Sequence, residues 1–211
     1  KRGRLQDLVA LLSGRNFETR NYEEEIVKES FTKLKKGLLT FMNENSFKRF
    51  LMILQSAGFI ESSMISSQNA INFAYIAYLN MKRENFEPSI IERNVRRWFV
   101  MSILTGRYSG SAESAIDFDI KRISAIGFSE FLQEVEEAEL SDAFWRVGLP
   151  QQMITSVATS PYFKVFLASQ VKSLDKGFLS KDISITDLIK YRGDIHHVFP
   201  KNYLKEHGLT R

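Results

Sequence analysis

The sequence predicts an all-α fold, a helical bundle that occupies most of the chain. Apolar residues recur at spacings of three and four over long stretches, which is the period of an α-helix. No stretch before residue 180 alternates apolar and polar residues in the manner of a β-strand. The chain has 211 residues, of which 44% are hydrophobic, so it is long and apolar enough to bury a large core as one domain.

Two amphipathic helices are predicted near the start of the chain. Apolar side chains fall on one face from Val27 to Phe41, and Asn21 is the expected N-cap of this helix. A second helix carries apolar residues from Phe47 to Leu54, with Ser46 as its expected cap and Gly58 at its end.

The centre of the bundle is predicted at the segment from Ala70 to Met81, which is apolar on almost every side. Ser66 or Ser67 is expected to cap it. Pro88 then fits the first turn of the next helix, which Gly106 ends. The inner face of that helix is expected to carry Ile91, Val95, Trp98, Phe99 and Ser102.

Further helices are predicted in the second half of the chain. One runs from Ser111 to Gly127, a short acidic helix follows it, and another runs from Ser160 to Gly177. Residues 148–160 are expected to form a long loop. Near the end, residues 195–199 are expected to be extended, and a short helix follows from Pro200 to Gly208.

Composition excludes several classes of function. Cysteine is absent, which excludes disulfides, zinc–thiolate sites and cysteine catalysis and favours a reducing compartment such as the cytoplasm. The phosphate-binding glycine motifs of P-loop and dinucleotide-binding proteins and the serine-hydrolase elbow are also absent. No apolar run reaches the roughly 20 residues of a membrane span, so we expect no membrane partner. The net charge of +4 permits nucleic acid as a partner without demanding it.

All three histidines lie in the last 16 residues, and two of them, His196 and His197, are adjacent. Adjacent residues of an extended segment point to opposite sides, so one imidazole can act as a general base while the other holds a metal ion. The alternative is one core and one surface histidine. His207 precedes Gly208 at a helix end, where a protonated imidazole interacts favourably with the helix dipole.

The segment RGDIHHVFPKNYLKEHGLTR, from Arg192 to Arg211, resembles the His-His-Ile-Phe-Pro motif of the HNH, or His-Me finger, nucleases. That domain ends the GmrSD-like restriction endonucleases, which attack modified foreign DNA. Further stretches are similar to the same family: LTGRYSGSAES at 104–114, NFAYIAYL at 72–79, RRWFV at 96–100 and FWRVGLP at 144–150.

The resemblance implies metal-dependent hydrolysis of phosphodiester bonds. By position His197 is the general base and His196 a ligand of one divalent ion, Mg²⁺ or Mn²⁺, with Asp194 in a supporting role. It also implies DNA as substrate and an N-terminal nucleotide-linked sensor domain in a longer parent protein, with a homo-oligomer as a further possibility.

The same resemblance divides the chain. Residues 1–180 form a helical bundle domain, and residues 181–211 form an incomplete ββα finger, an extended segment followed by a helix. The chain starts at Lys1 without Met and ends before the second strand and helix of a finger, so we expect a fragment with little or no cleavage activity.

Basic residues suggest where DNA can bind. Arg107 and Tyr108 lie between two glycines and, if exposed, suit contact with a phosphate and stacking on a base; the alternative is a turn packed on the bundle, with the arginine paired to a carboxylate. Arg93 and Arg97 lie on a basic helix face, for which a salt-bridged solvent face is the alternative. Lys201 is a further candidate.

Other charged residues have simpler explanations. Lys33, Lys35 and Lys36 are expected to be solvated, although they can add to a basic patch. Four glutamates between residues 134 and 139 are expected on a solvated helix face and not around a metal ion. Two hypotheses of other classes stay open beside the endonuclease: a helical module that couples a sensor domain to an effector or forms a dimer, and a DNA-binding module without cleavage.

Overall fold

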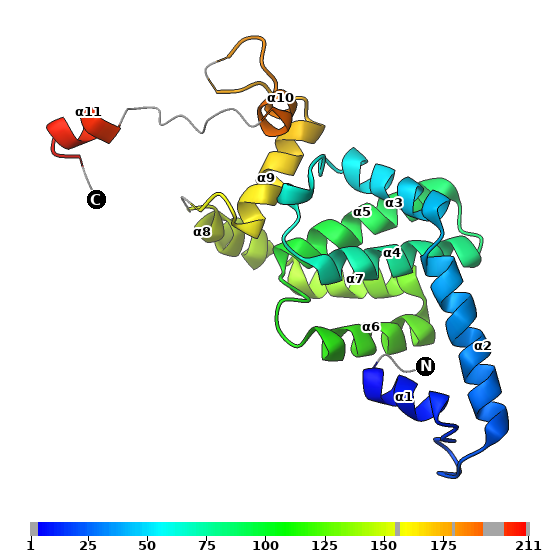
Figure 1. Cartoon of the computed structure of the whole chain (residues 1–211). Helices are drawn as coiled ribbons and strands as arrows, with labels where there is room; N and C mark the ends of the chain where they lie inside the picture. Colours follow the sequence, from blue (N-terminus) through cyan, green and yellow to red (C-terminus); the bar gives the residue numbers. More distant parts are fainter. Residues whose placement is uncertain (1–3, 155–156, 179, 192–200, 210–211) are drawn as a thin grey trace.

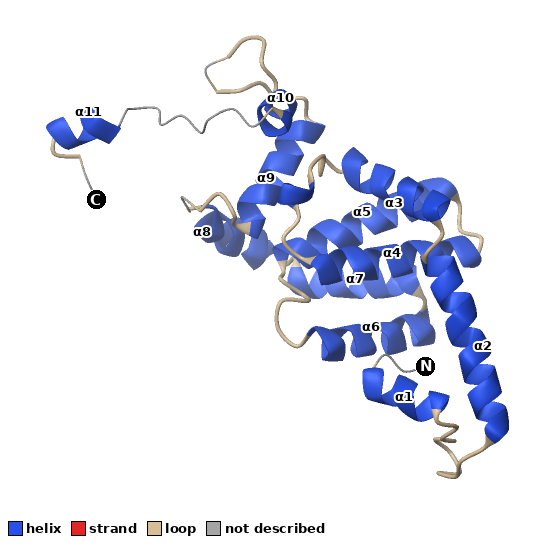
Figure 2. Ribbon diagram, in the orientation of Figure 1, coloured by secondary structure: helices blue, strands red, loops and turns tan. Residues whose placement is uncertain are grey.

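The computed structural model describes residues 4–154, 157–178, 180–191 and 201–209. Within these ranges the regular secondary structure is helical, without a β-strand, and this confirms the predicted all-α class (Figures 1 and 2). The α-helices are α1 (Leu5–Leu12), α2 (Glu24–Phe41), α3 (Glu44–Ser56), α4 (Gln68–Arg83), α5 (Pro88–Leu104), α6 (Ala112–Ile126), α7 (Phe128–Glu139), α8 (Leu149–Met153), α9 (Pro161–Lys172), α10 (Ile185–Lys190) and α11 (Lys201–Glu206). None of the helices in these ranges combines the length and the hydropathy that crossing a bilayer requires.

Helices α4 and α5 form the centre of the bundle, as the sequence predicts. They pack against each other along their lengths, and α3, α7 and α9 pack around α5. Seven residues of α4, from Ala70 to Met81, are buried. The predicted inner face of α5 is buried in full: Ile91, Val95, Trp98, Phe99 and Ser102.

Aromatic side chains fill the space between these helices. The Trp98 ring has no exposed surface and lies 5.5 Å from Phe73, 5.5 Å from Phe128 and 5.3 Å from Phe131, centroid to centroid. Tilted aromatic pairs at such distances contribute about 0.5–1.5 kcal/mol each beyond the burial of their area. Trp98 therefore joins α4, α5 and α7 into one core.

Helix α9 approaches the loop after α3 closely because that loop contains a glycine. Gly58 has φ +97°, a conformation that other residues rarely adopt. A Cβ atom at this position would lie 1.9 Å from the carbonyl oxygen of Ala168 in α9. Gly58 thus ends α3, as predicted, and also allows α9 to dock.

The helix starts correct some predicted caps and confirm others. Helix α3 begins two residues before Ser46, because Asn43 caps it and accepts a 2.8 Å hydrogen bond from the backbone N–H of Ser46. Helix α2 has Glu23 at its N-cap position, so the prediction of Asn21 is wrong. The predicted cap of α4 is confirmed, since Ser67 accepts a hydrogen bond from the backbone N–H of Ala70.

Two predicted boundaries in the second half are also wrong. Residues 148–160 are not a single long loop, because a π-helical turn (Phe144–Gly148) leads directly into α8. Helix α9 ends at Lys172, before the predicted Gly177, because Leu174 adopts a positive φ of 58°. The helix α10 follows a capping box in which Ser184 and Asp187 bond each other's backbone N–H groups.

Helix α2 runs along the edge of the molecule (Figure 1). Its end reaches the core, where Phe41 packs against Tyr75 with ring centroids 5.0 Å apart. Further back, Phe31 and Leu38 are 59% and 51% exposed, so the predicted apolar face is only partly buried. The cause is geometric, because among the described elements α1 and α4 are the main neighbours of α2.

Candidate nucleic-acid interface

The catalytic residues suggested by sequence, His196 and His197, lie outside the described residues, as does Asp194. Their roles stay predictions. Lys201 is the first residue of α11. His207 lies just beyond that helix, with its ring centroid 4.2 Å from that of Tyr203, which matches the predicted place at a helix end.

Arg107 and Tyr108 are placed in the loop between α5 and α6. Tyr108 is only 3% exposed and the Arg107 side chain only 12%, so the exposed arrangement that would leave both open to DNA is not the one observed. The guanidinium of Arg107 donates to both carboxylate oxygens of Asp119, at 3.0 Å from Nε and 2.5 Å from Nη2. Tyr108 donates its hydroxyl to the same carboxylate at 2.7 Å. The alternative stated for this loop, a packed turn with a paired arginine, is the observed arrangement.

The burial of this cluster changes how its groups ionise. Burial and the neighbouring charge of Asp119 raise the pKa of the Tyr108 hydroxyl far above 10. Burial alone would lower the pKa of Arg107, but the hydrogen bonds and negative charge of Asp119 outweigh it and raise that pKa. Arg107 also lies over the rings of Trp98 and Phe131, at 5.3 and 5.7 Å from the centroids. The cluster is a structural tie between α5, α6 and α7.

The basic face of α5 is partly neutralised by other helices. Arg97 donates from Nε to Glu136 of α7 at 3.0 Å, and Arg96 donates to the Ser56 hydroxyl of α3 at 3.2 Å. Arg93 is exposed, and the described part of the chain offers it no ion pair. A salt-bridged face is therefore observed at Arg97, whose partner Glu136 lies on α7.

Three glutamates of α7 lie beside arginines: Glu134, Glu136 and Glu139. Glu134 accepts from Arg122 of α6 at 3.1 and 2.6 Å, and Glu139 lies 3.9 Å from Arg107. Among the described residues, no group of three histidines, aspartates or glutamates is placed to hold a metal ion. The acidic face thus holds α6 and α7 together and balances the arginines of α5.

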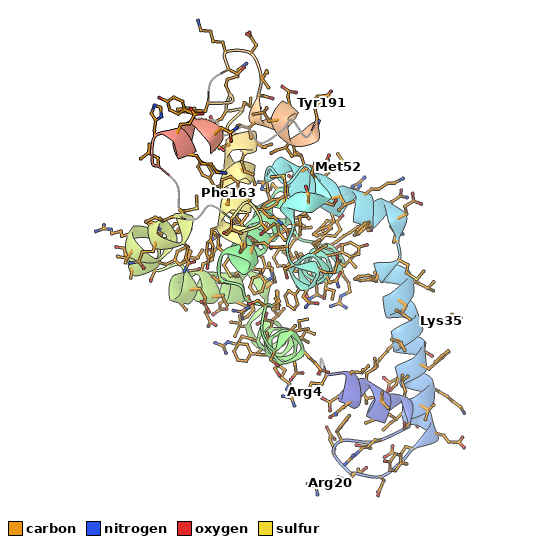
Figure 3. The ribbon with its side chains drawn as sticks, turned by 60° about the vertical axis from the view of Figure 1, so that its left-hand side comes forward. Arg4, Arg20, Lys35, Met52, Phe163 and Tyr191 are labelled. Atoms are coloured by element: carbon orange, nitrogen blue, oxygen red, sulfur yellow. The ribbon has the colours of Figure 1, made fainter. Side chains whose placement is uncertain are left out.

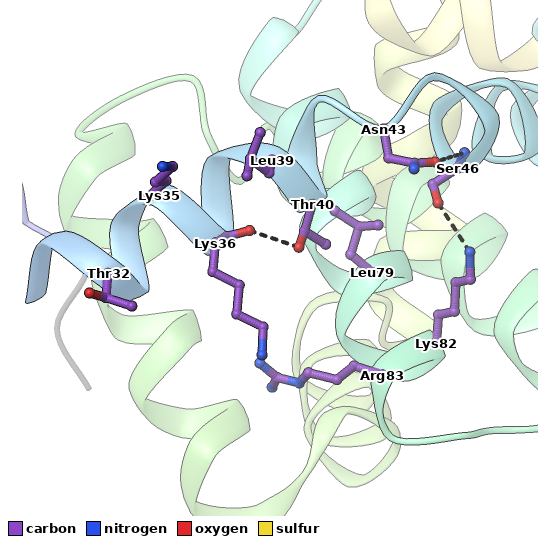
Figure 4. Close-up of a pocket in the computed structure, with 10 residues that line it drawn as sticks. All are labelled: Thr32, Lys35, Lys36, Leu39, Thr40, Asn43, Ser46, Leu79, Lys82 and Arg83. Atoms are coloured by element: carbon purple, nitrogen blue, oxygen red, sulfur yellow. Dashed lines mark hydrogen bonds between the residues drawn. The ribbon is translucent and has the colours of Figure 1, made fainter. Parts of the chain in front are cut away.

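A basic pocket lies between α2, α3 and α4 (Figure 4). Its volume is about 670 Å³. Four cations line it, two from α2 and two from the last turn of α4, and the other lining side chains are polar and neutral or aliphatic. The ten lining residues are Thr32, Lys35, Lys36, Leu39, Thr40, Asn43, Ser46, Leu79, Lys82 and Arg83. We call this set the basic pocket.

Two cations of the basic pocket donate hydrogen bonds to neutral acceptors. Lys82 donates to the Ser46 hydroxyl at 3.0 Å, and Ser46 is 5% exposed. Arg83 donates to the side-chain oxygen of Asn80 at 2.5 Å. Figure 4 shows Lys36 and Arg83 pointing toward one another from α2 and α4. Figure 3 shows Lys35 on the surface of α2, away from the core.

Carboxylates are scarce around these cations. No aspartate or glutamate is among the described residues that line the basic pocket. The carboxylate of Glu84 lies 3.9 Å from Arg83, but Glu84 is outside the lining. A second hollow of about 900 Å³ differs in this respect, because Glu87 and Glu92 line it together with Arg49 and with Lys82, which lines both hollows. The basic pocket is therefore the stronger anion site on electrostatic grounds.

Sequence reasoning found half of this pocket. The sequence indicates Lys35 and Lys36 as possible additions to a basic patch, but it does not single out Lys82 and Arg83, which end the mostly apolar central helix. A basic pair in the last turn of a helix is a common way to complement the helix dipole, so it carries no signal of its own. Only the packing of α2 beside α4 brings the two pairs together.

Comparison with known proteins gives one distant likeness to report. The chain is 29% identical over 119 residues to the uncharacterized protein MJ0686 of Methanocaldococcus jannaschii. That stretch is 55% of this chain and 19% of the archaeal protein, so the chain spans about a fifth of its relative's length. No protein-family model and no solved structure matches the chain.

Proposed function

We propose that this chain belongs to a metal-dependent DNA endonuclease that restricts modified foreign DNA. The observation that carries the proposal is the segment from Arg192 to Pro200, with its adjacent His196 and His197. Charged surface supports it: the basic pocket presents Lys36 and Arg83 without a lining carboxylate among the described residues.

The residues suggested by sequence offer a divalent cation one ligand, the imidazole of His196. Carboxylate and water ligands suit Mg²⁺ and Mn²⁺, and imidazole is a ligand for transition-metal ions. His196 would hold the ion, and Asp194 would orient an imidazole through a hydrogen bond. When bound, such an ion stabilises the negative charge that develops on a phosphodiester during hydrolysis.

The chain's own residues supply the base. His197 takes a proton from water through its neutral imidazole, and the water oxygen forms a bond to phosphorus. The bond from phosphorus to the 3′ oxygen breaks, that oxygen takes a proton from a water molecule, and His197 releases its proton to solvent. In this arrangement the bundle, tied by Trp98 and by the Arg107–Asp119 pair, is a rigid support and a surface for the DNA backbone.

Cleavage by the parent protein tests the proposal. Plasmid and phage DNA, modified and unmodified, are incubated with Mg²⁺ or Mn²⁺ and with chelator, using wild type, His197→Ala and the matched control His207→Ala. Loss of a general base lowers the rate about 100- to 10,000-fold, so His197→Ala abolishes visible cutting while His207→Ala keeps it. Cutting that is unchanged in His197→Ala would refute the assignment.

One observation favours a second function, that of a non-catalytic coupling or dimerisation module. Helix α2 leaves Phe31, Leu38 and Leu39 more than half exposed. Sedimentation of the chain over a hundredfold range of concentration distinguishes the two functions. A sedimentation mass that rises with chain concentration, without DNA affinity and without cleavage by the parent protein, would favour the coupling module.

A further inference from the structure

We propose that the basic pocket holds phosphate groups of the DNA backbone. The proposal rests on the function proposed above and deepens it, because it assigns the contact surface to α2, α3 and α4 and not to the loop of Arg107 and Tyr108.

The first argument is uncompensated charge. Lys35 and Lys36 are exposed, and within the described ranges neither makes an ion pair. Lys82 donates to a neutral hydroxyl. The neighbouring lysines of the same helices are different: Lys33 pairs with Glu29 and Lys48 with Glu44, each four residues away. Among the described residues, Arg83 is the pocket cation with a carboxylate near it, Glu84 at 3.9 Å and outside the lining, so the pocket keeps most of its positive charge.

The second argument is the direction of the side chains. Lys36 and Arg83 extend toward each other across the pocket, although like charges repel (Figure 4). An anion between them would turn this repulsion into two attractive contacts. Phosphate oxygens are the groups that lysine and arginine bind together on nucleic acids.

The third argument is the start of α3, which faces the same space through Asn43 and Ser46. The free N–H groups of a helix start carry partial positive charge and favour a phosphate. Asn43 occupies only one of them, the N–H of Ser46. The free backbone N–H groups at the start of α3 and the four cations therefore favour an anion on the same side of the molecule.

The shape favours a chain of phosphates over a single small anion. The cations come from two separate helices, and the pocket of about 670 Å³ is larger than one phosphate requires. Lys28 lies seven residues before Lys35, about two helical turns, and so continues the basic surface along the same face of α2. A polyanion can contact all of these groups, whereas a small anion meets two or three.

Fluorescence anisotropy of a labelled 20-base-pair duplex tests the proposal on the 211-residue chain. Lys36→Gln/Arg83→Gln removes two pocket cations and keeps good helix formers. Lys33→Gln/Lys48→Gln is the matched control, because it removes the same charge from lysines that are already paired. Thermal unfolding of each variant establishes that it is folded. Inorganic phosphate and tripolyphosphate serve as competitors.

We expect the pocket variant to bind the duplex about 10- to 100-fold more weakly at 50 mM salt. Its slope of log K against log salt should fall by about two, one unit for each lost phosphate contact. The control should change both quantities much less, and two duplexes of different sequence should behave alike.

The outcomes separate this inference from the proposed function. If wild type binds DNA and the two double variants weaken binding equally, the pocket assignment is wrong and DNA remains a partner. If millimolar tripolyphosphate, but no duplex, binds in a pocket-dependent manner, the occupant is a small anion and the proposal of a DNA backbone is overturned. If wild type binds no duplex at all, both the pocket assignment and the DNA-binding surface are overturned.

Discussion

The guanidinium of Arg107 faces both carboxylate oxygens of Asp119, a residue without exposed surface. Arg107 comes from the loop after α5, whereas Asp119 belongs to α6, so the pair fastens that loop to the next helix. Tyr108 completes the set by donating to Asp119. A buried charge is tolerated only when it is paired and hydrogen-bonded, and this carboxylate accepts three hydrogen bonds from its two neighbours.

Arg107→Met should destabilise the chain by about 3–5 kcal/mol, because it leaves the Asp119 carboxylate buried with only Tyr108 as a partner. Arg97→Met, which breaks the more exposed pair with Glu136, should cost about 1 kcal/mol or less. Urea unfolding gives both values. The apolar triple variant Arg107→Met/Tyr108→Phe/Asp119→Leu should recover most of the loss, and equal losses for the two single variants would contradict the buried pair.

Tyr108 should make the fold sensitive to alkali. Its pKa is raised in the folded state by burial and by Asp119, so the folded chain binds this proton more tightly than the unfolded chain does. The stability it contributes is complete below pH 10, the unfolded pKa, and falls as the pH rises above 10. Comparing the unfolding of wild type and Tyr108→Phe from pH 8 to 11 isolates this term. The variant should lose less stability over that range, and identical slopes would exclude the effect.

Asp187 should make α10 sensitive to acid. Hydrogen bonds from the Ser184 side chain and backbone lower the pKa of this carboxyl below its usual 3.8. A lowered folded pKa adds stability above pH 3.8 that is lost as the pH falls through the folded value. The protection of the Leu188 and Tyr191 amides, measured relative to their intrinsic exchange rates at each pH, should therefore fall at low pH in wild type, and should already be low at neutral pH in Ser184→Ala. Unchanged protection in that variant would show that the capping box does not stabilise α10.

Two glycines should respond to alanine in opposite directions. Gly58→Ala places a Cβ against the Ala168 carbonyl and requires a positive φ, so it should destabilise the chain and loosen α9. Gly37 lies inside α2 with open space around it, so Gly37→Ala should stabilise the chain by about 0.5–1 kcal/mol. Thermal unfolding of both variants checks the pair, and a neutral Gly58→Ala would contradict the close approach of α9.

The periodicity of the sequence by itself determined the class of fold and the identity of its centre. The segment from Ala70 to Met81 is apolar around its whole circumference, and only a buried position can accommodate such a helix. Pro88 and Gly127 mark helix ends because their backbone preferences act locally. The paired histidines at 196 and 197 are likewise a feature of sequence alone, and their role awaits the cleavage experiment.

The tertiary structure decided which charged residues are free. Arg107 and Lys36 are equally hydrophilic in the sequence, yet Arg107 is buried against Asp119 and Lys36 faces the open pocket. The residues that decide this lie on other helices. Asp119, which neutralises Arg107, comes from α6, and Arg83, the cation that Lys36 approaches, comes from α4. Whether a charge is neutralised depends on distances of a few ångströms across helices, and helical periodicity sets only the face on which each residue stands.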